Sequence, residues 1–125
     1  MGGLGSSSDR AAVDQVDSAS LGYAPTDVVR FSYRGGVVPR SDASGPLGPL
    51  GSSTYAPIDT EVDLHESADR LVTLLHAVAA AAPGVPVDVI AHSQGGLVVR
   101  LALIRADRPQ ALGTVVTLGT PHQGA

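Results

Sequence analysis

The 125-residue sequence contains no cysteine, no lysine and no tryptophan, and only 3% of its residues are aromatic. The lack of cysteine excludes disulfides, thiolate metal sites and a cysteine nucleophile. Because all eight basic residues are arginine, a Schiff-base or Ser-Lys mechanism carried by this chain alone is also excluded. Hydrophobic residues still make up 43% of the chain, so we expect one domain with a core of Val, Leu, Ile and Ala.

The sequence also lacks a long apolar run and an excess of positive charge. No stretch approaches the roughly 20 apolar residues that span a bilayer, and the first residues do not resemble a signal peptide. The formal net charge of −4 argues against a nucleic-acid partner, which would favour a basic surface. These patterns do not assign a cellular compartment or an oligomeric state.

The most informative stretch runs from Val87 to Arg100. It combines a strand of β-branched residues, the turn Ala91-His92-Ser93-Gln94-Gly95, and an apolar helix. In a nucleophile elbow, a serine at such a strand-to-helix turn projects its hydroxyl above the sheet, and the residues two before and two after it must be small. Ala91 and Gly95 meet that requirement, so the pattern predicts Ser93 as a nucleophile. The alternative is an unreactive serine in a buried turn.

Strands and helices are predicted to alternate along the chain. The patterns favour helices over 9–20, 64–82 and 94–106, strands over 28–33, 87–91 and 115–118, and a Gly/Pro/Ser-rich loop over 34–58. Ser8 is the expected N-cap of the first helix, and Thr60 with Asp63 resembles a capping box before the second. The loop is interpreted either as a mobile insertion or as an active-site flap.

This alternation predicts an α/β fold, a three-layer parallel sheet with helices on both faces and the 87–91 strand at its centre. Sites in such sheets form beyond the carboxyl ends of the strands. The loops at 34–36, 92–94 and 120–122 are therefore expected to converge on Ser93.

The elbow, together with Gly119-Thr120-Pro121-His122-Gln123-Gly124, resembles the α/β-hydrolase lipases and esterases. The similarity is greatest to class 2 lipases and to esterases related to the inositol deacylase of glycolipid anchors. The resemblance implies that residues 1–125 are a partial α/β-hydrolase domain, running from the oxyanion loop through the strand after the elbow.

The resemblance also implies roles for individual residues. Gly2-Gly3-Leu4-Gly5 looks like the family's oxyanion loop, so the backbone N–H groups of Gln94 and Leu4 are expected to form the oxyanion hole, with Gly3 lining the pocket. His92 and His122 are expected to line the pocket as well. An alternative for residues 2–8 is a disordered start.

The family's triad runs Ser, then Asp or Glu, then His, and here the sequence departs from it. Asp107 falls at the far end of the elbow helix, and His122 belongs to a pocket-lining segment. We therefore expect a central fragment whose acid and base lie elsewhere. The competing hypothesis is a non-catalytic remnant.

The implied function is a serine hydrolase acting on carboxylic esters, with lipid or other acyl esters as substrates and peripheral contact with lipid. An acyltransferase or thioesterase of the same fold remains an alternative. No cofactor is implied. A metal site of Asp88, His92 and His122 is disfavoured, because the spacing matches no common ligand motif.

Overall fold

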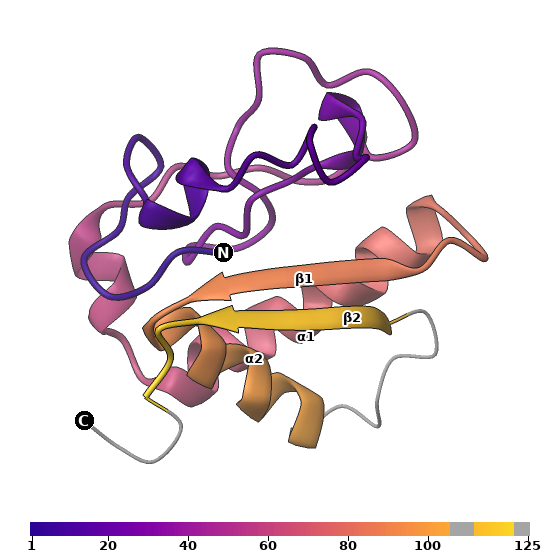
Figure 1. The fold of residues 1–125 in the computed structure, drawn as a ribbon. Helices are drawn as coiled ribbons and strands as arrows, with labels where there is room; N and C mark the ends of the chain where they lie inside the picture. Colours follow the sequence, from indigo (N-terminus) through magenta and orange to yellow (C-terminus); the bar gives the residue numbers. More distant parts are fainter. Residues whose placement is uncertain (106–111, 122–125) are drawn as a thin grey trace.

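The computed structural model describes residues 1–105 and 112–121. Its regular elements are two strands, two α-helices and three short 3₁₀ turns (Figure 1). In chain order they are η1 (Ala12–Gln15), η2 (Pro25–Asp27), η3 (Pro57–Glu61), α1 (Leu64–Ala81), β1 (Val87–His92), α2 (Gln94–Arg105) and β2 (Leu112–Leu118).

The strands β1 and β2 pair in parallel and are joined through α2. The pairing aligns Val89 with Val115 and His92 with Leu118, and it is irregular between Val87 and Val89. At that irregularity the Asp88 carboxylate accepts the Thr114 backbone N–H at 2.8 Å. The predicted strand–helix–strand unit around the elbow is therefore confirmed.

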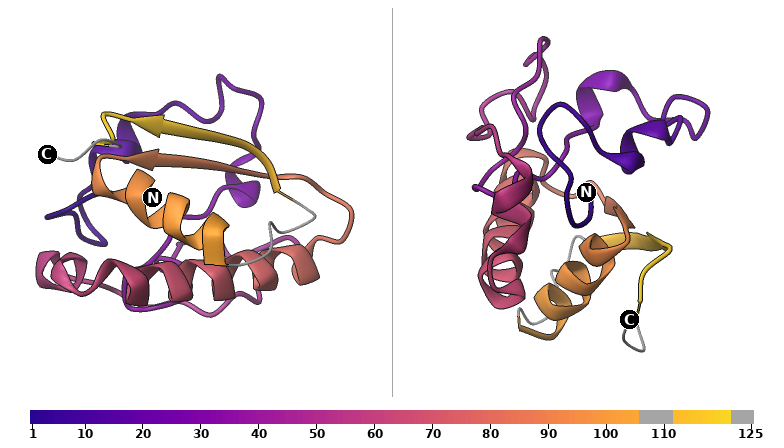
Figure 2. Two further views of the ribbon diagram at one scale, coloured as in Figure 1. Left: turned by 90° about the horizontal axis from the view of Figure 1, so that it is seen from below. Right: turned by 90° about the vertical axis from the view of Figure 1, so that its left-hand side faces the viewer.

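Both α-helices lie on the same side of this sheet, and the irregular segments of the first 63 residues lie along its β1 edge, above β1 in Figure 1 (Figures 1 and 2). Burial of small and branched side chains holds the layers together: Leu71 and Leu75 of α1 and Val98 and Ala102 of α2 are all buried. The helices are also linked at the surface by an ion pair between Arg105 and Asp69. Within the described ranges the chain is α/β with a two-stranded sheet, and a third strand or a helical layer on the second face is not found.

The prediction of a strand over 28–33 is wrong. Phe31 makes only an isolated antiparallel bridge with Val37, and the place beside β1 that this strand was expected to fill is taken by Met1. The Met1 amino group donates to the Ile90 carbonyl at 2.5 Å, and the His92 N–H donates to the Met1 carbonyl at 3.1 Å. These two bonds are the pattern of a parallel ladder, so Met1 continues the sheet on the edge of β1 opposite β2.

The helix predicted over 9–20 is also not formed, except for the single turn η1. Its expected N-cap, Ser8, is engaged elsewhere: its hydroxyl accepts the Tyr55 backbone N–H at 2.6 Å. The Gly/Pro/Ser-rich segment contains no helix before η3 and packs through buried Val37, Leu47 and Tyr55. It is an irregular segment with its own anchors in the core.

The helix predicted over 64–82 is confirmed as α1, but its cap differs from the prediction. The side chain of Asp63 accepts the His65 N–H at 2.8 Å and is the N-cap. Thr60 takes no part in that cap, because it lies fully buried in η3.

Candidate active site

Ser93 occupies the sharp turn between β1 and α2. Its φ is 54°, the one positive value among the non-glycine residues that the structure describes. Two backbone bonds hold the turn: the Ser93 N–H donates to Leu118 O at 2.8 Å, and the Gly96 N–H donates to Ser93 O at 3.0 Å. A non-glycine residue kept in the left-handed region costs about 1–3 kcal/mol and is typical of functional turns.

Three glycines allow the backbone to crowd around this turn. A Cβ on Gly3 would lie 2.8 Å from the Ser93 Cβ and 3.3 Å from the Gln94 nitrogen. A Cβ on Gly95 would lie 2.7 Å from the Gly2 carbonyl oxygen, and one on Gly96 would lie 2.1 Å from the Thr120 hydroxyl. The loop at residues 2–5 and the segment after β2 therefore both pack against the elbow, as the sequence predicted for these two segments.

The loop at residues 1–8 is ordered, so the alternative of a disordered start is not supported. Ser6 N–H donates to Gly3 O at 3.2 Å, which closes a turn with Leu4 and Gly5 at its centre. Gly5 adopts a φ of 79°, which a residue with a Cβ would rarely tolerate.

A small aromatic cluster supports this loop, and sequence reasoning missed it. Tyr33 is fully buried, and its hydroxyl donates to the Gly2 carbonyl at 2.8 Å. Burial raises the pKa of Tyr33, with the nearby Tyr55 adding to the shift, so the phenol stays protonated and remains a donor. The rings of Phe31 and Tyr55 lie 5.2 and 5.3 Å from that of Tyr33. Three of the four aromatic residues in this chain thus lie in one cluster. Because aromatic residues are so few here, their spacing in the sequence was a signal that could have predicted this cluster.

Arg30 fastens the end of the same loop. Its guanidinium donates to the carbonyl of Ser7 at 2.6 Å and to the carbonyl of Ser8, and it also bonds the Tyr55 hydroxyl at 2.9 Å. Ser6 Oγ lies 2.8 Å from the same Tyr55 hydroxyl. Loop and cluster therefore form one connected network of hydrogen bonds.

Among the described residues, the backbone N–H groups of Leu4 and Gln94 have no acceptor, and neither do those of their neighbours Gly3 and Gly95. They belong to the two segments that Gly3 brings into contact. Free amide donors at a helix N-terminus favour a negative oxygen. The Ser93 hydroxyl likewise has no partner within the described ranges.

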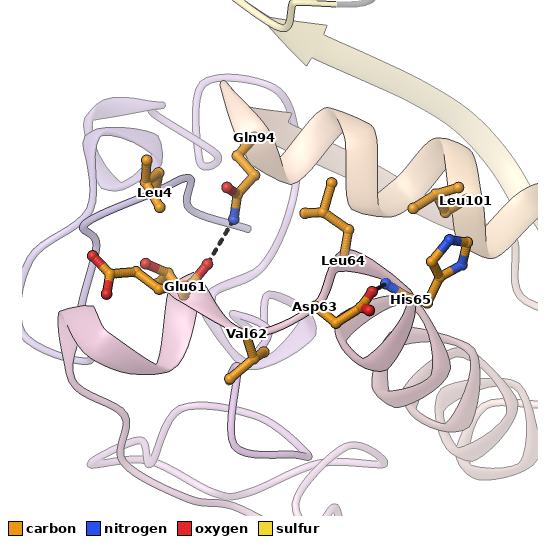
Figure 3. A pocket seen from close by; sticks show the side chains of 9 residues that line it. Leu4, Glu61, Val62, Asp63, Leu64, His65, Gln94 and Leu101 are labelled. Atoms are coloured by element: carbon orange, nitrogen blue, oxygen red, sulfur yellow. Dashed lines mark hydrogen bonds between the residues drawn. The ribbon is translucent and has the colours of Figure 1, made fainter.

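An open groove of about 770 Å³ is lined by Leu4 and Gln94, whereas Ser93 is not among its lining residues (Figure 3). Leu4, Leu64 and Leu101 contribute apolar surface, and the Leu4 side chain is 61% exposed. Figure 3 shows the Gln94 side chain pointing from the start of α2 toward η3, where its Nε2 donates to the Thr60 carbonyl at 2.9 Å. The groove is mainly apolar, with acidic side chains of Glu61 and Asp63 at its border.

The predicted histidines are distributed unevenly. His92 ends β1 and is half-buried next to Ser93, whereas His122, like Asp107, lies outside the described residues.

Gly35 does not join the elbow by any described contact, and its carbonyl accepts the Ser53 hydroxyl instead. The Asp88 carboxylate accepts hydrogen bonds from the Tyr23 hydroxyl and the Thr114 N–H. Across the described residues, no group of three or more His, Asp or Glu side chains is arranged to hold a metal ion.

No helix within the described part of the chain is both long and apolar enough to cross a membrane.

Comparisons with known proteins point in one direction. Residues 64–125 match the PGAP1-like alpha/beta domain. A triacylglycerol lipase of Pseudarthrobacter phenanthrenivorans and another of Burkholderia plantarii are each 40% identical over 57 residues, which is 46% of this chain. The chain spans only 17% and 15% of the lengths of these two relatives. No solved structure matches it.

Proposed function

We propose that Ser93 is the nucleophile of a serine hydrolase that cleaves carboxylic esters, since residues 64–125 match a PGAP1-like alpha/beta domain and part of the chain is similar to two triacylglycerol lipases. The observation that carries the proposal is the positive φ of Ser93 at the strand-to-helix turn. This conformation holds a nucleophilic side chain at the carboxyl end of a strand, where substrates reach parallel sheets.

In the proposed reaction, Ser93 Oγ attacks the ester carbonyl carbon and its proton passes to a histidine. The carbonyl oxygen becomes an oxyanion, which the N–H groups of Leu4 and Gln94 stabilise. Collapse expels the alcohol, which takes up the proton from the histidine, and water then hydrolyses the acyl-enzyme by the same steps. The free N–H groups and the close contact of Gly3 with the elbow support this assignment.

The general base has to be identified by experiment, because the Ser93 hydroxyl has no hydrogen-bond partner among the described residues. His122, which we propose as a lining residue, is the alternative base that the labelling experiment tests, because its segment follows Thr120, which packs against Gly96 at the start of α2.

The apolar groove supports an acyl ester as the substrate. Leu4, Leu64 and Leu101 would contact a hydrocarbon chain, and burial of each methylene contributes about 0.8 kcal/mol. The exposed side chains of Leu4 and Ile58 support a peripheral contact with a lipid surface. We propose His92 and His122 as further lining residues.

The proposal is tested by fluorophosphonate labelling and ester hydrolysis with the polypeptide expressed from its native gene. Ser93→Ala should abolish both while leaving the circular dichroism spectrum unchanged. Ser44→Ala, at an exposed serine in the long loop, is the matched control and should keep both. Label on another serine, or hydrolysis that survives Ser93→Ala, contradicts the assignment of the nucleophile.

Labelling of the 125-residue chain and of its His122→Ala variant then identifies the base. Fast labelling that disappears in His122→Ala assigns the proton transfer to His122. If the native gene product shows no labelling and no ester hydrolysis, the result favours the non-catalytic alternative. Product analysis with an added alcohol separates hydrolysis from acyl transfer.

A further inference from the structure

Thr60 connects the two segments that carry the free N–H groups. It is fully buried in η3. Its Oγ1 accepts the Gly5 N–H at 2.9 Å and donates to the Pro57 carbonyl at 2.6 Å. Its own carbonyl accepts Gln94 Nε2 at 2.9 Å. One residue therefore holds the loop through its side chain and the elbow through its backbone.

The contact with Gly5 bears directly on the orientation of Leu4. Leu4 and Gly5 are the central residues of the turn closed by the Gly3–Ser6 bond. Fixing the Gly5 N–H on Thr60 fixes the peptide plane between Leu4 and Gly5, and the turn transmits that constraint to the Leu4 N–H. A Cβ position on Gly5 has no neighbour within 4 Å, so no side-chain packing at Gly5 duplicates the restraint from Thr60.

The contact with Gln94 constrains the other donor. Gln94 is the first residue of α2 and immediately follows the strained Ser93. A side-chain bond to a carbonyl of η3 restrains the first turn of the helix, where the Gln94 N–H lies. Oxyanion stabilisation depends on donors held within a few tenths of an ångström, so such restraints act on rate more than on substrate binding.

We propose that Thr60 is a positioning residue that sets the Leu4 and Gln94 N–H groups relative to each other, a role that rests on the proposed function of Ser93. The hydroxyl acts on the loop and the carbonyl acts on the elbow.

The test compares Thr60→Val, Thr60→Ser and wild type in the native gene product. Valine keeps the branched shape but removes the hydroxyl, whereas serine keeps the hydroxyl. We expect Thr60→Val to lower kcat by about tenfold to hundredfold with KM within about twofold, since loss of one oxyanion donor costs about 10²–10³ in kcat. Thr60→Ser should restore most of the kcat.

Two controls separate positioning from loss of stability. Val78→Ala truncates a buried residue of α1 and should lower the melting temperature without lowering kcat. Hydrogen exchange at the Gly5 amide should accelerate in Thr60→Val and return toward wild type in Thr60→Ser. If Thr60→Val does not fold, Gln94→Met tests the second arm, because it removes the Nε2 donor and retains the backbone N–H.

Different experimental results would overturn the role of Thr60 and the proposed function of Ser93. A Thr60→Val enzyme with wild-type kcat, alongside an inactive Ser93→Ala, overturns the role of Thr60 alone. A raised KM with unchanged kcat also overturns it. Hydrolysis that persists in Ser93→Ala overturns both.

Discussion

Gly3 and Ser93 lie so close together that a Cβ on Gly3 would come within 2.8 Å of the Ser93 Cβ. The same Cβ would lie 2.8 Å from the carbonyl oxygen of His92. These residues are about 90 positions apart in the chain. Their contact joins the N-terminal loop to the elbow, and the geometry of the candidate site depends on it.

Gly3→Ala is therefore expected to displace the loop from the elbow. Forcing a methyl group into this contact should cost about 1–3 kcal/mol of stability and slow the labelling of Ser93. Gly51→Ala is the control, because its Cβ would meet nothing within 4 Å. Thermal melts and labelling rates of the two variants measure the difference, and equal behaviour would contradict the packing.

Tyr33→Phe should loosen the same loop from its other side. The substitution keeps the buried ring but leaves the Gly2 carbonyl without the donor that now lies 2.8 Å away. We expect a loss of about 1–3 kcal/mol in the free energy of unfolding, measured by urea denaturation. Tyr23→Phe removes a more exposed bond to Asp88 and should cost less. A cost for Tyr23→Phe that equals or exceeds that for Tyr33→Phe would argue against the anchoring role.

The Met1 amino group should make stability depend on pH. Burial, together with the Arg30 charge, lowers its pKa from 8.0 to about 5, because the charged form loses solvation. Between these two values the unfolded chain binds more protons than the folded chain, so stability should rise as pH increases from 5 to 8. A shift of this size corresponds to an upper bound of about 4 kcal/mol over the full window.

N-terminal acetylation provides the control for that prediction, because it removes the charge and keeps an N–H donor for Ile90. Urea midpoints of the free and acetylated chains should diverge as pH falls toward 5 and converge near pH 8. Parallel pH profiles for the two forms would show that the amino group is not buried as described.

Ser67→Ala should leave stability unchanged or raise it. Ser67 is fully buried on α1, and its hydroxyl has no partner among the described residues. Removing an unsatisfied buried hydroxyl relieves a desolvation cost of about 1–3 kcal/mol. Ser6→Ala is the matched comparison, because the buried Ser6 hydroxyl lies 2.8 Å from that of Tyr55, and its loss should destabilise. Destabilisation by Ser67→Ala as large as that by Ser6→Ala would reveal a partner for this hydroxyl.

The sequence by itself determined the elements whose pattern is local and periodic. The apolar stripe of α1, the β1–turn–α2 unit and the parallel β2 all follow from residue spacing. Small residues beside Ser93 indicated the crowded turn, because close approach of backbones leaves no room for a Cβ. The position of the loop at residues 2–5 beside the elbow was predicted from resemblance and is found in the structure.

Only the tertiary structure decided the rest, because the deciding contacts join residues far apart in the chain. Residues 28–33 have a strand-like composition, yet Met1 takes the edge of β1 and Tyr33 turns toward Gly2. Thr60 resembles a helix cap in sequence, but its partners Gly5 and Gln94 lie 55 and 34 residues away. Local propensity does not encode such pairings, since backbone and hydroxyl groups choose their partners when the chain packs and buried polar groups must be satisfied.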